Sequence, residues 1–205
     1  MKISVTKLGK RYNRDWIFRN LDFEFEAGKH YAITGPNGSG KSTLLQIISG
    51  ASIFNEGKLS YFEDQKPFQP EKVFQKISFA APYLDVVEEM TLTELFSFHH
   101  NMKGWLEGLE TEKIIHVSAL RNAAHKQIRY FSSGMKQRVK LAQAIFSNVP
   151  VVLLDEPLTN LDEEGVSLYH NLIEKYCKNR LLIISSNDRK EYSFCNEIVD
   201  MRNYK

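Results

Sequence analysis

The chain has 205 residues, a net charge of +2, and 42% hydrophobic and 25% charged residues. This composition is ordinary for a folded protein with one core, or one core with a small inserted lobe. The low net charge and the lack of any run of five basic residues argue against a nucleic-acid-binding surface. No apolar stretch approaches the roughly 18 residues that cross a bilayer, and the N-terminus lacks a secretory signal pattern. Cys177 and Cys195 lack metal-ligand spacing, so we expect reduced thiols in a cytoplasmic protein.

Three short stretches near the N-terminus predict strands. Apolar and polar residues alternate over residues 3–8 and again over 21–26, which is the pattern of a strand with one buried face. Short turns join them, so we expect an antiparallel arrangement. Residues 10–13 between them are expected to form a loop that exposes Tyr12. The apolar run 31–33 predicts a buried strand.

A glycine-rich turn follows the strand at 31–33, and an apolar helix pattern follows the turn. It matches the phosphate-binding P-loop in the required strand–loop–helix context, through Gly35, Pro36, Asn37, Gly38, Ser39, Gly40, Lys41, Ser42 and Thr43. Glycines let backbone N–H groups turn toward a phosphate, and the following helix points its positive end there. In this pattern Lys41 reaches the β- and γ-phosphates of a nucleotide, and the Ser42 hydroxyl holds Mg²⁺.

The segment 85–128 has a different, helical character. A capping pattern, Thr91 followed by Glu94, begins one helix. Its apolar stripe consists of Leu92, Leu95, Phe96 and Phe98. A second helix is predicted over 109–121. We therefore expect a helical lobe, 85–128, inserted into an α/β core formed by residues 1–84 and 129–205.

Strands and helices alternate in the rest of the chain. Strands are predicted at 57–62, 77–80, 151–154, 181–184 and an exposed last strand at 197–201; helices are predicted at 131–146 and from Asp162 onward; a polar surface loop is predicted at 63–72. The continuous apolar runs at 151–154 and 181–184 indicate strands buried on both faces. The fold class expected is therefore α/β, with a P-loop NTPase core, a mostly parallel sheet and N-terminal antiparallel strands.

Two adjacent carboxylates, Asp155 and Glu156, follow the buried strand at 151–154. A nucleotide at a P-loop needs a second Mg²⁺-positioning carboxylate, usually at the end of a neighbouring buried strand. Asp155 suits that role. Glu156 projects in another direction and is a candidate general base for the attacking water.

With these motifs in place, the chain resembles the ATP-binding-cassette (ABC) ATPases over essentially its whole length. Five segments match the family's motifs in order: Tyr12, Gly35–Thr43, Phe131-Ser132-Ser133-Gly134-Met135, Val151–Pro157 and Asn160-Leu161-Asp162. The five-residue signature between the P-loop and the acidic pair is the most specific of these.

The resemblance implies a role for each motif. Tyr12 stacks on adenine. Ser132, Ser133 and Gly134 hold the γ-phosphate of ATP bound to the other subunit, and Asp162 belongs to a dimer-contacting loop. The resemblance also implies a head-to-tail homo- or heterodimer that encloses two ATP molecules.

Two positions depart from the family's pattern. Pro82 stands where the family usually has a glutamine near Mg²⁺ and the attacking water, and Asn187 stands where it usually has a histidine near the γ-phosphate. Asparagine can donate a hydrogen bond but cannot take up a proton. Ser133 in place of a glycine is a milder change. Either these changes are tolerated in an active enzyme, with Asn187 among its catalytic residues, or they make hydrolysis slow and nucleotide binding acts mainly as a clamp.

The resemblance implies the ATPase subunit of a membrane transporter, peripheral on the inner face of the cell membrane, with ATP and Mg²⁺ as cofactors. Its partners would be a separate transmembrane permease and a second ATPase subunit. One alternative is a slow or inactive regulatory cassette that is paired with another ATPase. A second alternative is a non-transport protein that acts on ribosomes or nucleic acid.

Overall fold

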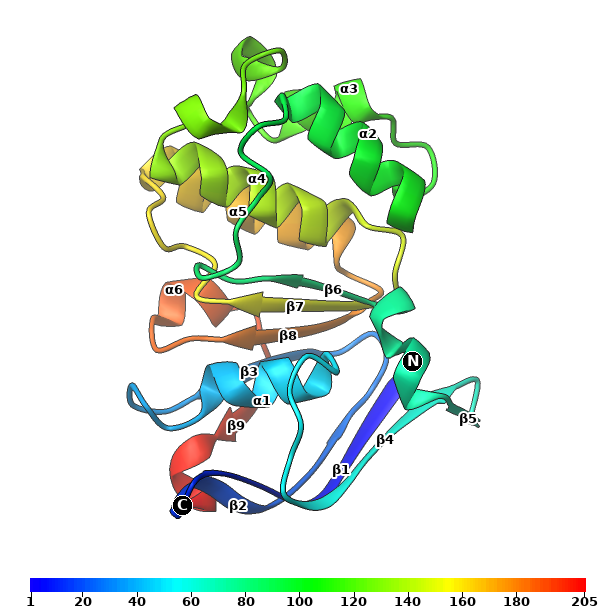
Figure 1. Cartoon of the computed structure of the whole chain (residues 1–205), viewed down its shortest axis with the longest axis vertical. Helices are drawn as coiled ribbons and strands as arrows, with labels where there is room; N and C mark the ends of the chain where they lie inside the picture. The colour runs from blue at the N-terminus through cyan, green and yellow to red at the C-terminus, as the bar shows by residue number, and fades with distance from the viewer.

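The computed structural model describes all 205 residues and contains two sheets (Figure 1). The first is antiparallel, with strand order β2-β1-β4-β5, and consists of β1 (Lys2–Tyr12), β2 (Asp15–Phe25), β4 (Glu56–Glu63) and β5 (Lys66–Phe68). The second is parallel, with strand order β6-β7-β8-β3-β9, and consists of β6 (Ile77–Ala80), β7 (Val151–Asp155), β8 (Leu181–Ser185), β3 (His30–Thr34) and β9 (Glu197–Asp200). The predicted fold class is thus confirmed.

The helices cover both faces of the parallel sheet. They are α1 (Lys41–Ile48), α2 (Leu92–Lys103), α3 (Thr111–Val117), α4 (Ser133–Phe146), α5 (Glu163–Tyr176) and α6 (Arg189–Tyr192), with short 3₁₀ helices η1 (Pro70–Gln75), η2 (Arg121–Ala123), η3 (Ile128–Tyr130) and η4 (Met201–Tyr204). Helices α4 and α5 lie on one side of the parallel sheet with α2 and α3 beyond them, and α1 lies on the other side (Figure 1).

Strand β7 separates two hydrophobic cores. Val152 and Leu154 belong to the cluster shared with α2, α3, α4 and α5. Val151 and Leu153 belong to the cluster shared with α1 and the antiparallel sheet. Successive side chains of a strand point to opposite faces, so a strand that is covered on both sides must be apolar throughout. This explains why the run 151–154 contains no polar residue.

Several predicted boundaries are wrong. Tyr12 is not in a loop, because β1 continues through it to a turn at Asn13, where φ is +54°. The segment 63–72 is not all loop, since it contains β5 and the start of η1. The second helix of 85–128 spans only Thr111–Val117.

Burial corrects two further expectations. The capping box at Thr91 and Glu94 is present, and Leu92, Leu95 and Phe96 are buried. Phe98, predicted to complete that stripe, is 49% exposed instead. The last strand is not simply exposed, because Val199 is buried, and Met201 is buried within η4 rather than in the strand.

Candidate nucleotide site

The carboxyl ends of β6, β7 and β8 lie at one edge of the parallel sheet, beside the loop before α1 and the first turn of α4 (Figure 1). That loop, Gly35–Gly40, joins β3 to α1 and needs glycine at both ends. Gly35 has φ +139°, and a Cβ there would lie 2.8 Å from Ser39 Oγ. Gly40 has φ +97°, and a Cβ there would lie 2.6 Å from Ile17 Cγ2. Both positions are therefore closed to other residues.

Lys41 folds back over this loop. Its side chain is buried, and its Nζ donates hydrogen bonds to the carbonyl oxygens of Gly35 at 2.8 Å and Pro36 at 3.4 Å. The ammonium group is thereby held above the turn that the P-loop pattern assigns to a phosphate. The Oγ of Ser39, fully buried in the same turn, has no hydrogen-bond partner.

A pocket of about 310 Å³ opens at the loop. It is lined by Ile17, Asn37, Gly38, Gly40, Lys41, Ser42, Thr43 and Glu156. Glu156 lies more than 100 residues along the chain from the other polar residues of the pocket. The structure therefore brings the candidate general base to the candidate phosphate-binding loop, as the sequence predicts.

Asp155 ends β7 with its carboxylate buried beside this pocket. The residue is 2% exposed, and neither carboxylate oxygen has a hydrogen-bond partner. A buried carboxylate without partners is costly unless a cation or donor satisfies it. Two free oxygens, with the Ser42 hydroxyl on the pocket wall, are the kind of donor set that Mg²⁺ prefers. The residues present therefore fit a Mg²⁺ ion that is completed by phosphate and water.

Glu156 has strained backbone geometry, with φ at +42°. Its N–H donates to the carbonyl oxygen of Ser185 at 2.9 Å, which fixes the turn after β7 against the end of β8. A non-glycine residue in this region costs free energy, and such positions gather at functional sites. The turn directs the exposed Glu156 side chain toward the pocket.

The two departures from the family's pattern differ in what they contact. Asn187 Nδ2 donates to Asn37 Oδ1 at 3.1 Å, so the loop after β8 reaches the loop before α1. Pro82 makes no side-chain hydrogen bond, but its carbonyl oxygen accepts from Lys140 Nζ at 2.7 Å. Asn187 is therefore within reach of the pocket wall, and the hydrogen bond at Pro82 is made by its backbone carbonyl alone.

Tyr12 lies at the end of β1 and is half exposed. The Lys10 ammonium is 4.6 Å from the centre of its ring. Because Lys10 is buried and donates to the Ile53 carbonyl oxygen at 2.8 Å, it restrains one face of the ring. Stacking on adenine, the role that the family resemblance implies, needs an exposed ring, and the Tyr12 ring is exposed.

The signature residues do not line the pocket of their own chain. Ser132 caps α4 by accepting a hydrogen bond from Met135 N at 3.2 Å, and Ser133 and Gly134 begin the helix. Asp162 caps α5 and accepts from Gly165 N at 2.8 Å, a bond that lowers the pKa of its carboxyl together with Arg138. These residues are exposed or half-buried on the surface, where a second molecule can reach them.

Sequence reasoning missed three residues of this region. Ile17 forms part of the pocket wall. The Tyr83 hydroxyl lies near Asp155 and Gln46; burial, followed by the charge of Asp155, raises its pKa, although it makes no hydrogen bond of normal geometry to that carboxylate. Glu191 is buried and accepts a hydrogen bond from the backbone N–H of Leu158, two residues after Glu156. In the sequence, only the proline at position 82, next to Tyr83, marks this part of the site as unusual.

Comparison with known proteins agrees with this geometry. The sequence profile of the ABC transporter family matches residues 18–159. An uncharacterised ABC transporter ATP-binding protein, YybJ of Bacillus subtilis, is 31% identical, with 97% of this chain and 92% of the relative covered. The lantibiotic transport ATP-binding protein SrtF of Streptococcus pyogenes is 28% identical, with 90% and 79% covered.

Solved structures share the fold. A putative ABC transporter ATP-binding protein from Pyrococcus furiosus superimposes with a TM-score of 0.83 at 24% identity, and both chains are covered completely. A dimeric ATP-binding cassette with ADP and phosphate bound gives a TM-score of 0.80 at 20% identity, with 97% of this chain and 93% of that chain covered. No helix of this chain has the length and apolar character needed to cross a membrane. The chain belongs to the ABC transporter family, as the ATP-binding, ATP-hydrolysing subunit.

Proposed function

We propose that this subunit works as a Mg²⁺-dependent ATPase that pairs head to tail with a second cassette beneath a separate transmembrane permease. The observation that carries the proposal is the single pocket formed by the P-loop and Glu156, with the unpaired carboxylate of Asp155 beside it. ATP binding would close the pair and hydrolysis would reopen it. The proposed location is the cytoplasmic face of the membrane, where such a permease would hold the subunit.

The roles of the side chains follow from their chemistry. Lys41 and the loop amides would bind the β- and γ-phosphates, and Ser42 and Asp155 would hold Mg²⁺, which would neutralise phosphate charge. Glu156 would accept a proton from the attacking water, and Asn187 would donate its amide hydrogen bond to the γ-phosphate. Tyr12 would stack on adenine.

The dimer proposal rests on residues that the pocket leaves unused. Ser132, Ser133 and Gly134 lie at the exposed positive end of the 14-residue helix α4, which favours an anion. In a head-to-tail pair this end would face the γ-phosphate of ATP on the partner. A Cβ on Gly134 would lie 2.9 Å from the carbonyl oxygen of Asn160, so the signature and the loop before Asp162 form one surface.

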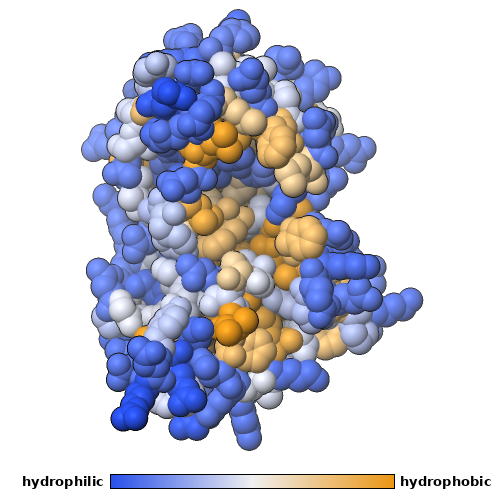
Figure 2. Space-filling model, in the orientation of Figure 1, coloured by the Kyte–Doolittle hydropathy of each residue, from blue (hydrophilic) through white to orange (hydrophobic).

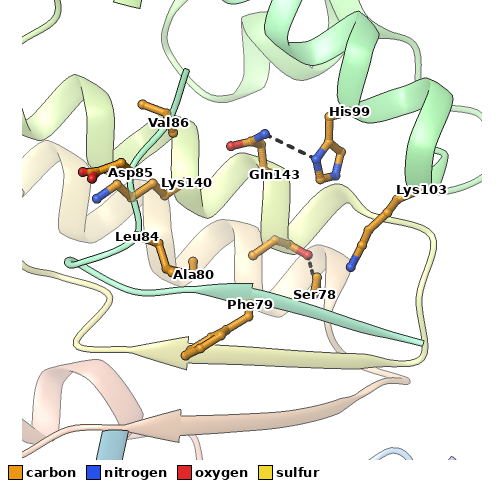
Figure 3. Close-up of a pocket in the computed structure, with 11 residues that line it drawn as sticks. Ser78, Phe79, Ala80, Leu84, Asp85, Val86, His99, Lys103, Lys140 and Gln143 are labelled. Atoms are coloured by element: carbon orange, nitrogen blue, oxygen red, sulfur yellow. Dashed lines mark hydrogen bonds between the residues drawn. The ribbon is translucent and has the colours of Figure 1, made fainter. Parts of the chain in front are cut away.

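A hollow between the sheets and the helical segment supports docking of a permease (Figure 2). It contains a cavity of about 270 Å³ between β6, α2 and α4 (Figure 3). Leu84 lines it. Phe98 and Met102 of α2 are exposed, and each directly precedes a residue that lines the cavity, His99 or Lys103. Exposed apolar side chains of this size suit a protein partner. We propose that residues 85–128 form a lobe that carries the motion to the permease.

The cavity is also basic. Lys103 and Lys140 line it; burial lowers the pKa of His99 to about 4, so this histidine adds no charge. Asp85 is the only acid on the wall. An amphipathic permease helix with an acidic side chain would complement this charge.

Membrane association tests the docking proposal. The chain is produced in its native cells, and membranes are separated from ribosomes. We expect the wild type to co-purify with a polytopic membrane protein, and the Phe98→Asp/Met102→Asp variant to lose that protein while keeping its ATPase activity. Recovery with ribosomes or RNA would contradict the transport role. Recovery with a different cassette alone would favour the regulatory reading that Pro82 and Asn187 left open.

A further inference from the structure

Two loops carry the residues that face the nucleotide pocket from the sheet. One follows β7 and runs from Glu156 to Asp162; the other follows β8 and contains Asn187. The backbone bond from Glu156 N to Ser185 O, 2.9 Å, joins them only at their beginnings. Something else must set the position of the rest of the Glu156–Asp162 loop relative to Asn187.

Glu191, on α6, supplies that second link. Its Oε1 accepts a hydrogen bond from the backbone N–H of Leu158 at 2.7 Å. The residue is 4% exposed, although glutamate is rarely buried without a partner. Thirty-three residues separate the two groups, so the bond connects segments that only the fold brings together.

The backbone of Glu191 is itself fixed. Its carbonyl oxygen accepts from the hydroxyl of Tyr169 at 2.8 Å, and Tyr169 is fully buried in α5. Its N–H donates to Asp188 O at 3.0 Å, which closes the turn directly after Asn187. The backbone that carries the carboxylate is therefore fixed, and one of the hydrogen bonds that fix it is made by Asp188, the residue next to Asn187.

Leu158, the other partner of this hydrogen bond, belongs to a loop whose residues are bonded to one another. Leu158 O accepts from Leu161 N at 3.0 Å, and Thr159 N donates to Glu156 O at 3.2 Å, so the loop is one connected turn. Gln137 Nε2 of α4 donates to Pro157 O at 2.9 Å. A shift of Leu158 would therefore move Glu156 on one side and the segment before Asp162 on the other.

We propose that Glu191 is a positioning residue for ATP hydrolysis, which holds the Glu156–Asp162 loop in register with the Asn187 loop through the amide of Leu158. The proposal rests on the proposed function, since Glu156 and Asn187 act on the nucleotide there. Glu191 itself touches neither substrate nor reacting atoms. Its contribution is to hold Glu156 and Asn187 in the correct relative position. A misplacement of about 1 Å in a catalytic group can cost about 100-fold in rate.

Two conservative variants separate reach from charge. Glu191→Gln keeps the side-chain length and an oxygen that can accept the Leu158 N–H, but it has no charge. Glu191→Asp keeps the charge, but its side chain is one methylene shorter. Glu191→Ala removes both, and Glu174→Gln, on the exposed face of α5, is the matched control.

The measurements are kcat and KM for ATP, the affinity for a non-hydrolysable ATP analogue, and the melting temperature. We expect Glu191→Gln to keep kcat within about threefold of the wild type, and Glu191→Asp and Glu191→Ala to lose about tenfold or more, with KM and analogue affinity changed less than about twofold. Glu191→Asp carries the test if Glu191→Ala does not fold.

Three results would overturn the proposal: an unchanged kcat in Glu191→Asp and Glu191→Ala, a better rate in Glu191→Asp than in Glu191→Gln, or parallel losses of kcat, analogue affinity and melting temperature. Absence of turnover in the wild type would contradict the proposed function instead. In that case the ATP-dependent dimerisation of the same variants, followed by light scattering, decides the role of Glu191, because its loop leads into Asp162.

Discussion

The amide nitrogen of Asn187 donates a hydrogen bond to the side-chain oxygen of Asn37 at 3.1 Å, across 150 residues of sequence. The bond joins the loop after β8 to the P-loop before α1. Asn37 lines the nucleotide pocket, so the bond brings the Asn187 amide to the pocket wall. In the proposed function this N–H would donate to the γ-phosphate of ATP instead.

Replacing Asn187 tests this amide. We expect Asn187→Ala to lower kcat about tenfold or more, because a hydrogen bond to a charged oxygen is lost, with little change in ATP affinity. Asn187→His retains an N–H donor and should stay within about threefold of the wild type. Steady-state kinetics of both variants measure this. A tenfold rise in Asn187→His would instead mean that Asn187 limits the rate, and an unchanged rate in Asn187→Ala would remove it from the mechanism.

Asp155 is expected to lower the stability of the ligand-free chain and to be required for Mg²⁺-dependent hydrolysis. Its buried carboxylate lacks partners in the ligand-free chain, so Asp155→Asn should raise the free energy of unfolding by about 1 kcal/mol. The same change should reduce Mg²⁺-dependent hydrolysis about 100-fold or more, because the proposed ligand is lost. Urea unfolding without nucleotide and a Mg²⁺ titration of turnover measure the two effects. A variant that is less stable and equally active would contradict both assignments.

Tyr12 is expected to contribute to ATP affinity through its ring. Tyr12→Ala should weaken ATP binding about threefold to tenfold, since aromatic stacking contributes about 1 kcal/mol. Tyr12→Phe keeps the ring and serves as the control, with an affinity close to that of the wild type. Binding of a fluorescent ATP analogue gives both constants. Equal affinities in Tyr12→Ala and the wild type would place adenine elsewhere.

Glu191 also predicts a pH dependence of stability. Burial raises the pKa of its carboxyl from 4.5 to about 7. The nearby Ser186 hydroxyl and the hydrogen bond from the Leu158 amide oppose the rise, and the charges of Glu156 and Asp188 add to it. The folded chain binds this proton more tightly than the unfolded chain. Its contribution is therefore fully present below pH 4.5 and is lost as the pH rises to about 7.

Glu191→Gln has no such proton. Between about pH 5 and about pH 8 we therefore expect the wild type to lose about 2.5 kcal/mol of unfolding free energy relative to Glu191→Gln. Urea unfolding of both proteins at the two pH values measures the difference. Parallel pH dependences would mean that Glu191 titrates near its ordinary value in the folded chain.

Much of this site could be predicted because its motifs are local. The P-loop needs glycine where φ is positive and a lysine at the start of α1, and these lie within nine consecutive residues. Asp155 could be placed because the apolar run before it marks a buried strand whose carboxyl end must meet the same edge as β3. The lining of one pocket by Lys41 and Glu156 follows from that edge.

Other features depend on packing between distant segments, which no local pattern records. Phe98 lies three residues after the buried Leu95, as a helical stripe requires, yet it is exposed rather than packed in the core. Tyr12 was expected in a loop because the pairing that extends β1, Tyr12 with Asp15, is made with a strand predicted only from residue 21 onward. In the sequence Glu191 is one of several charged residues near the end of the chain. Its role becomes visible only in the fold, where its side chain accepts a hydrogen bond from Leu158 N.

The most direct test of the account is ATP hydrolysis by the purified chain as a function of its concentration, beside Glu156→Gln. If two copies enclose ATP and Glu156 activates water, the wild-type rate per molecule should rise cooperatively with concentration. Glu156→Gln should lose at least about 100-fold in rate while it binds ATP and accumulates as a dimer. Tight ATP binding with no turnover in either protein would contradict an active self-dimer and direct the search to a different partner cassette.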